Sequence, residues 1–151
     1  MGGIPARLTA AVSFVVDRVR ADVGPLAGLP PESVVAVRLD PAWAEDPAGD
    51  TAGDAAGDLI VSVFGGRHEF PLGLEDGVEY ACWNLADQVQ DDVVGELGRP
   101  WPELVGPAGE PLGVLEPMLL GGLAGWALRG RAFCAVGQLP AAVTAAGLTV
   151  T

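Results

Sequence analysis

The sequence has no lysine, a single histidine and only two cysteines, and these shortages limit the chemistry that it can perform. Its eight basic residues are all arginines, against twenty aspartates and glutamates, so the net charge is −12. A field of this sign repels nucleic-acid phosphates and anionic membranes and attracts basic surfaces. We therefore expect no nucleic acid and no membrane as partners, and another protein with a basic surface instead. The alternative is that the acidity only keeps the chain soluble.

The single histidine and the two cysteines limit the catalytic and metal-binding sites that this chain can form. His68 would have to serve any triad or Cys-His dyad, and no serine lies in a nucleophile-elbow pattern. In a strand, His68 would share a face with Phe70 and Leu72, so we expect its side chain in the core or at the rim of the core. Cys82 and Cys134 lie in apolar stretches, and one histidine with two distant cysteines has no zinc-ligand spacing. We expect free thiols, no metal and no cofactor.

Residues with AT-rich codons are also scarce, with one asparagine and two isoleucines, as is typical of a GC-rich bacterial genome such as that of an actinobacterium. The N-terminal LTAAVSFVV is followed at once by DRVR and has no A-x-A cleavage site, so no signal peptide is expected. The apolar run LLGGLAGWAL is too short to span a bilayer. We expect a cytoplasmic protein with a single domain over 1–151.

The periodicity of apolar residues predicts an α+β fold, in which an antiparallel sheet of about five or six strands packs with two main helices. The expected order of elements is α-β-β-β-α-β-β(-β)-α. The Gly65-Gly66 pair predicts a tight hairpin, and Pro71 marks its second strand as an edge strand. Helices are expected over 5–23, 76–97 and 140–147. Further strands are expected near 33–39, 113–120, 123–129 and 131–137.

Polar positions on the two long helices differ in what they suggest. In the first helix, the charged residues Arg7, Asp17, Arg18 and Asp22 lie off the apolar stripe. In the second, Asp87 and Asp91 are neighbours at i and i+4 on the polar face. Paired carboxylates hold metals in helical bundles, but those sites also need a Glu-x-x-His pattern that is absent here. Asp87 and Asp91 are expected on a solvated face and are kept as candidate binding residues.

The segment PAGDTAGDAAGD places an aspartate after each Ala-Gly pair, within an acidic stretch over 40–58. An EF-hand needs ligands at positions one, three and five, and this spacing differs. As a helix, the segment would stack like charges at i and i+4. We therefore expect 40–58 to be a flexible acidic loop that binds no cation specifically. Trp43 precedes the aspartates and is a candidate binding residue, because exposed aromatics beside a mobile loop suit a protein interface.

The stretch ACWNLADQVQDDVVGELGRPWPE resembles a group of small uncharacterised actinobacterial proteins. Those proteins carry a helix with an Ala-Asp-Gln-Val-Gln core, here 86–90, followed by Trp-Pro, here Trp101-Pro102. In that group a segment with Cys-Pro and His follows and ends in His-Pro-Leu. This chain has Glu110 where that histidine would stand, so a metal role does not carry over. Trp101 is a further candidate binding residue. The order of elements, with the small size and acidity, is also similar to that of type III secretion chaperones.

Two classes of function follow from these observations. The first is a non-catalytic protein-binding module of the chaperone, immunity or regulator type, and the acidity and the missing catalytic set favour it. The alternative is a metal-dependent or hydrolytic enzyme that uses Asp87, Asp91 or His68. A pocket that joins those three residues would favour the enzyme, and an apolar patch would favour the binding module. Edge strands and the Gly-rich apolar C-terminal half also predict a homodimer.

Overall fold

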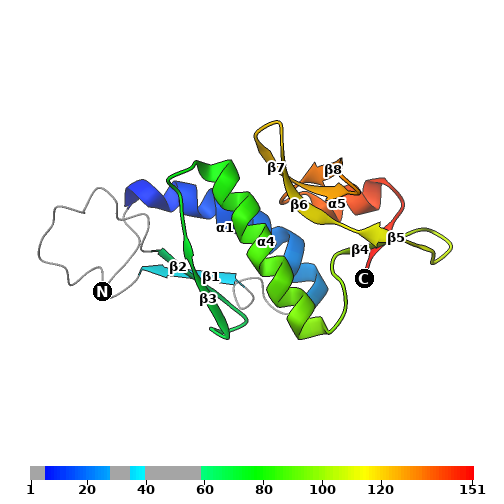
Figure 1. Ribbon diagram of the computed structural model, residues 1–151, viewed down its shortest axis with the longest axis horizontal. Helices are drawn as coiled ribbons and strands as arrows, with labels where there is room; N and C mark the ends of the chain where they lie inside the picture. The colour runs from blue at the N-terminus through cyan, green and yellow to red at the C-terminus, as the bar shows by residue number, and fades with distance from the viewer. Residues whose placement is uncertain (1–5, 28–34, 40–58) are drawn as a thin grey trace, which may run out of the picture.

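The computed structural model describes residues 6–27, 35–39 and 59–151. Within them the chain forms three helices, α1 (Ala6–Ala27), α4 (Val78–Leu97) and α5 (Leu139–Ala145). Helices packed against antiparallel strands confirm the predicted α+β class (Figure 1). The acidic stretch at 40–58 and Trp43 lie outside the described residues. The nine strands in the described part are β1 (Val35–Leu39), β2 (Leu59–Val63), β3 (His68–Leu72), β4 (Glu103–Val105), β5 (Pro111–Val114), β6 (Glu116–Leu120), β7 (Leu123–Leu128), β8 (Arg131–Ala135) and β9 (Thr149–Val150).

The strands form three antiparallel sheets of three strands each, in the orders β1-β2-β3, β5-β4-β9 and β6-β7-β8. This arrangement corrects the expectation of one sheet with five or six strands. The expected strand over 113–120 breaks at Leu115, whose N–H donates to the carbonyl of Pro102. As a result β5 pairs with β4, while β6 pairs with β7. The sequence also did not predict β4 and β9, because strands of three and two residues are too short to show a period.

The β2–β3 hairpin forms where Gly65-Gly66 predicts it. Along β2, buried residues alternate with half-buried ones, as expected for a strand with one face on the core. Phe64, Gly65 and Gly66 have φ values of 52°, 69° and 95°, so the turn needs the conformational freedom of glycine. The edge position of β3 confirms the prediction from Pro71.

The α4 helix is the central element and crosses α1 (Figure 1). It ends at Gly98, which has a φ of 67° and donates its N–H to the carbonyl of Val94. The apolar period of this helix predicts a stripe of Val78, Cys82, Leu85, Val89, Val93 and Leu97. The structure buries its four central members together with Ala81 and Ala86, while Val78 is half-buried and Leu97 is exposed. The α1 helix adds buried valines to the same core at positions 12, 15, 16, 19 and 23.

One hydrophobic cluster extends through both ends of the molecule. The β1-β2-β3 sheet lies at one end, and β4 to β9 gather with α5 at the other, with α1 and α4 between them (Figure 1). Trp101 and Trp126 meet edge-to-face in the core, with ring centroids 5.7 Å apart. Among the described residues, no helix has both the length and the apolar character needed to cross a membrane.

Candidate functional site

The two carboxylates predicted on the polar face of α4 lie on an open surface. Asp87 is half-buried and Asp91 is exposed. Burial raises the pKa of Asp87, and the negative charges of Asp91 and Glu116 raise it further. In the part of the chain that the structure describes, no group of three or more histidines, cysteines, aspartates or glutamates is placed to hold a metal ion. The charge of Asp91 disfavours the ionised form of Asp87, as expected for like charges at i and i+4.

His68 lies at the rim of the fold, with an exposed side chain on β3. Its Nδ1 atom is 3.3 Å from Oδ1 of Asp92 on α4. Burial raises the pKa of Asp92, and the charge of His68 opposes that rise. The structure thus pairs His68 with Asp92, a residue that the helical pattern does not single out, instead of with Asp87 or Asp91.

Both thiols are free, as the sequence predicts. Cys82 is buried in α4, and Cys134 is half-buried in β8. Burial is the main cause that raises the pKa of each thiol to about 12. Thiols with such a pKa stay protonated at neutral pH and are weak nucleophiles.

Trp101, a candidate binding residue from the sequence, is 0% exposed and packs against Trp126. The side-chain amide of Gln90 donates to the carbonyls of Trp101 and Leu115, at 3.0 and 2.6 Å. Gln90 and Trp101 both belong to the stretch that resembles the actinobacterial group. In this structure they join α4 to the strands that follow it, so they stabilise the core and do not present a binding surface.

Asp22 is a buried carboxylate that ties α1 to the C-terminal half, and its exposed fraction is 3%. Its Oδ2 accepts hydrogen bonds from Nε1 of Trp126 at 2.8 Å and from the N–H of Gly137 at 2.6 Å. Its Oδ1 accepts one from the N–H of Leu139 at 3.0 Å, at the start of α5. Burial raises the pKa of Asp22, and these three hydrogen bonds oppose the rise.

The approach of the β8–α5 loop to α1 requires a glycine. Gly137 has a φ of 100°, and a Cβ at this position would stand 3.1 Å from Cβ of Arg18. Distances this short are tighter than ordinary van der Waals contact, so a side chain here would push the loop away from α1. The glycine thus allows the short contact between its own N–H and Asp22.

Arg18 and Glu79 form a bridge above this loop. The two guanidinium nitrogens of Arg18 donate to the carboxylate of Glu79 at 2.6 and 3.2 Å, and its Nε donates to the carbonyl of Val136 at 2.9 Å. Glu79 also accepts a hydrogen bond from the N–H of Ala124 at 2.9 Å. This bridge joins α1, α4, β7 and the loop after β8 in one network.

Four exposed hydrophobic side chains belong to α1, α4 and the β6–β7 hairpin, and we call them the apolar rim: Phe14, Tyr80, Leu119 and Leu123. The ring of Phe14 has its centroid 4.9 Å from Cζ of Arg18. Tyr80 follows Glu79 in α4, and Leu119 and Leu123 lie beside Ala124 in the β6–β7 hairpin. Phe14 is 50% exposed and Leu123 is 62% exposed. Leu123 lies opposite Leu120 and Leu119 lies opposite Ala124, so the two leucines are on opposite faces of the hairpin.

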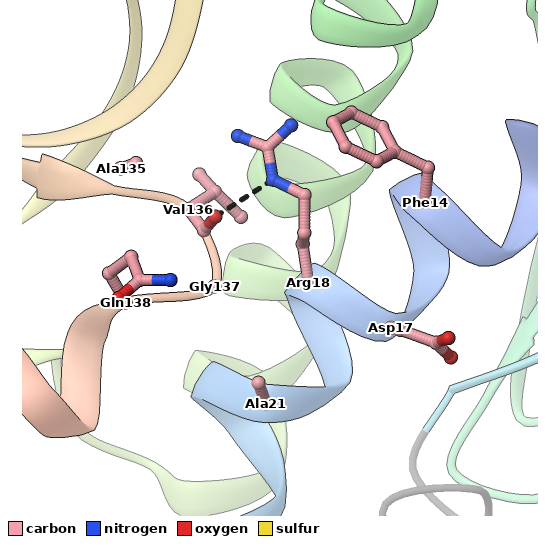
Figure 2. Close-up of a pocket in the computed structure, with 8 residues that line it drawn as sticks. All are labelled: Phe14, Asp17, Arg18, Ala21, Ala135, Val136, Gly137 and Gln138. Atoms are coloured by element: carbon pink, nitrogen blue, oxygen red, sulfur yellow. Dashed lines mark hydrogen bonds between the residues drawn. The ribbon is translucent and has the colours of Figure 1, made fainter.

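Two open hollows adjoin the apolar rim and share Ala135. The first has a volume of about 390 Å³ and lies between α1 and the loop after β8 (Figure 2). Figure 2 shows the Arg18 side chain crossing this hollow from α1 toward Val136, with the ring of Phe14 beside it. The second has a volume of about 220 Å³, and its lining is almost wholly apolar, with Leu120, Leu123, Phe133 and Cys134.

One acidic side chain lines the first hollow. Asp17 is largely exposed there, and its Oδ1 is 3.5 Å from Nη1 of Arg20. Glu75 and Asp76 are exposed just before α4, a few residues from Tyr80. The charge of Arg18 is compensated by Glu79. Both charged side chains that line the first hollow, Asp17 and Arg18, are therefore paired with groups of opposite charge.

Comparison of the chain with protein-family models, with curated proteins and with solved structures finds no match in any of the three. The likeness to the actinobacterial group and to type III secretion chaperones therefore stays a prediction. The function has to be argued from the surface itself.

The residues that build this surface were mostly not predicted from the sequence. Arg18 and Asp22 lie off the apolar stripe of α1, yet Asp22 is buried, because its partners close over it. Those partners are far along the chain: Glu79 is 61 residues from Arg18, and Trp126 is 104 residues from Asp22. A charged residue directly beside the valine stripe is the one signal in the sequence, and by itself it does not identify a partner.

Proposed function

We propose that this protein is a non-catalytic protein-binding module of the chaperone, immunity or regulator type, which acts in the cytoplasm on a partner with a basic surface. The observation that carries the proposal is the apolar rim, because exposed aromatic and aliphatic groups beside hollows are typical of protein interfaces. The net charge of −12 favours a basic partner over an acidic one.

The alternative function, a metal-dependent or hydrolytic enzyme, has weaker support. The structure does not bring its candidate catalytic residues together, since His68 contacts Asp92 while Asp87 lies near Glu116. The two cysteines are protonated at neutral pH. The hollows beside the apolar rim contain none of Asp87, Asp91 and His68.

Site-specific cross-linking tests the proposed function. A photoreactive amino acid at position 123 should capture a partner in cells of the native host, and the same amino acid at Leu97 should not capture it. Leu97 is a matched control, because it is also an exposed leucine but ends α4, about 25 Å along the helix from Tyr80.

The captured protein is then purified and its binding to the full chain is measured. Leu123→Asp should weaken this binding and Leu97→Asp should not. Equal cross-linking at both positions, or binding that is indifferent to Leu123→Asp, would refute a role of the apolar rim in partner recognition.

A further inference from the structure

A further hollow lies between α1, α5 and β9, and a buried carboxylate lines it. Its volume is about 340 Å³, and we call it the Asp22 hollow. Asp22 is the one charged residue in its lining, and its exposed fraction is 3%. Leu139, Val143 and Leu148 supply much of the remaining wall. The lining includes no member of the apolar rim, so a ligand of this hollow is independent of the proposed function.

The negative charge of Asp22 is held by dipoles and not by a paired cation. In the part of the chain that the structure describes, Asp22 forms no ion pair. Arg18 is the smallest of the causes that lower its pKa, and the guanidinium of Arg18 is bound to Glu79. Because charged groups are rarely buried without an oppositely charged partner, the Asp22 hollow favours a cation as its ligand.

The hydrogen bonds of Asp22 leave one acceptor position open on its carboxylate. A carboxylate has about four such positions, two on each oxygen. Oδ2 accepts from Trp126 and Gly137, while Oδ1 accepts from Leu139 alone. Leu139 also lines the hollow, so the open position on Oδ1 adjoins it. The three hydrogen bonds hold the carboxylate in a fixed orientation, which lowers the entropy cost of binding a ligand.

We propose that the Asp22 hollow binds a primary alkylammonium group, which donates a hydrogen bond to Oδ1 of Asp22. The alkyl chain lies against Leu139, Val143 and Leu148. An ammonium is a compact charge that can use a single acceptor, whereas a guanidinium fork prefers two acceptors on one carboxylate. A divalent metal ion needs several oxygen ligands, and the described residues place no group of three metal-binding side chains together.

Two sources can supply this ammonium group, a free small amine and the side chain of a lysine in another protein. Thr144 and Thr149 line the hollow and are exposed, so they lie at its opening. A lysine can therefore enter with its backbone in solvent. Pentylamine represents the first source, and Nα-acetyl-lysine methylamide represents the second.

Binding of these two amines to the full chain at neutral pH tests the inference, with pentanol and pentylguanidine as controls. We expect calorimetry to show saturable binding of pentylamine. Pentanol, which has no charge, and pentylguanidine should bind about tenfold more weakly or less. Nuclear magnetic resonance should show shifts of the indole N–H of Trp126 and the amide of Leu139, because both donate to Asp22. Tighter binding of the lysine derivative than of pentylamine would identify a lysine side chain as the source, and weaker binding would identify a free amine.

Variants at the hollow separate this site from general attraction between an acidic chain and a cation. Asp22→Asn should weaken the binding of pentylamine by about tenfold or more, since the charged acceptor is lost. Thr144→Lys brings an ammonium of the chain itself to the opening and should compete with pentylamine. Ala145→Lys adds the same charge at an exposed position of α5 outside the lining, and it should bind pentylamine as the wild type does. If Asp22→Asn does not fold, as judged by circular dichroism, the comparison of the two lysine variants decides.

Four outcomes would overturn the inference. Pentanol that binds as tightly as pentylamine would show that the charge of Asp22 plays no part. Tighter binding of pentylguanidine would exclude the single-acceptor geometry. Equal weakening by Thr144→Lys and Ala145→Lys would show attraction to the net charge alone. If neither amine binds, Asp22 only joins α1 to α5, and the cross-linking experiment still decides the proposed function.

Discussion

Glu79 is the residue whose ionisation most directly affects the network under the apolar rim. The hydrogen bond from Arg18 is the main cause that lowers the pKa of Glu79 below its ordinary value of 4.5, although burial opposes it. A pKa lowered by folding means that the ionised group stabilises the fold above the ordinary pKa, and that this stability is lost as the pH falls through the folded pKa. The ion pair is thus fully formed at neutral pH and is broken in acid.

We therefore expect Glu79→Gln to lower the free energy of unfolding by roughly 1 kcal/mol at neutral pH. The difference from the wild type should shrink as the pH falls below 4.5, because protonation removes the same charge from the wild type. Thermal unfolding of both proteins over a pH series measures this. A difference that stays constant into acid would contradict the assignment of the stability to the charge of Glu79.

Asp87 should behave in the opposite way. Its pKa is raised by burial and by the charges of Asp91 and Glu116, so its ionised form is disfavoured in the fold and costs stability as the pH rises through that pKa. We expect Asp87→Asn to raise the free energy of unfolding by about 0.2–0.5 kcal/mol at neutral pH, with little difference from the wild type in acid. Asp91→Asn relieves the same i, i+4 repulsion. Urea unfolding at both pH values measures the effect, and a destabilised Asp87→Asn protein would show that this carboxylate has a favourable partner.

The same two variants test the metal-dependent alternative. We expect Mg²⁺ and Mn²⁺ to leave the melting temperature of the wild type unchanged, because the described residues form no cluster that holds a metal ion. A ligand that binds the native state raises its stability by linkage. A rise in melting temperature with Mn²⁺ that disappears in Asp87→Asn and Asp91→Asn would support the enzyme instead.

At the level of elements, α4 contributes a full buried face to the core. Leu85 is 0% exposed and lies in the middle of the buried face of this helix. We expect Leu85→Ala to cost about 2–5 kcal/mol, through the lost transfer free energy and the cavity that remains. Leu97→Ala, on the same helix but exposed, should change stability by no more than about 0.5 kcal/mol. Chemical denaturation of the two variants measures the contrast, and equal costs would mean that the apolar stripe does not carry the core.

The helices and strands also show which features can be predicted from the sequence and which cannot. A 20-residue helix repeats its apolar period several times, and Gly98 marks its end, so α4 was predicted nearly residue for residue. The Gly65-Gly66 turn is equally local. The break at Leu115 depends on a hydrogen bond to Pro102, and the sites of Asp22 and Glu79 depend on partners in other elements. Local patterns therefore predict α4 and the Gly65-Gly66 turn. The Leu115 break and the sites of Asp22 and Glu79 are determined by contacts between distant segments, which the sequence pattern does not show.

At the scale of the whole molecule, net charge opposes self-association and open strand edges favour it. Each copy carries a net charge of −12, which opposes a homodimer, while open edges such as β9 of the β5-β4-β9 sheet favour it. We predict a homodimer formed through sheet edges away from the apolar rim. Because salt screens the repulsion between the two copies, the dimer should become stronger as the ionic strength rises.

Light scattering at several protein and salt concentrations measures this association, and a monomer mass at high protein concentration in every salt would refute it. Leu123→Asp separates the two kinds of contact. If the dimer uses a sheet edge, this variant should dimerise as the wild type does. If Leu123→Asp abolishes the dimer, Leu123 lies on the surface where two copies meet.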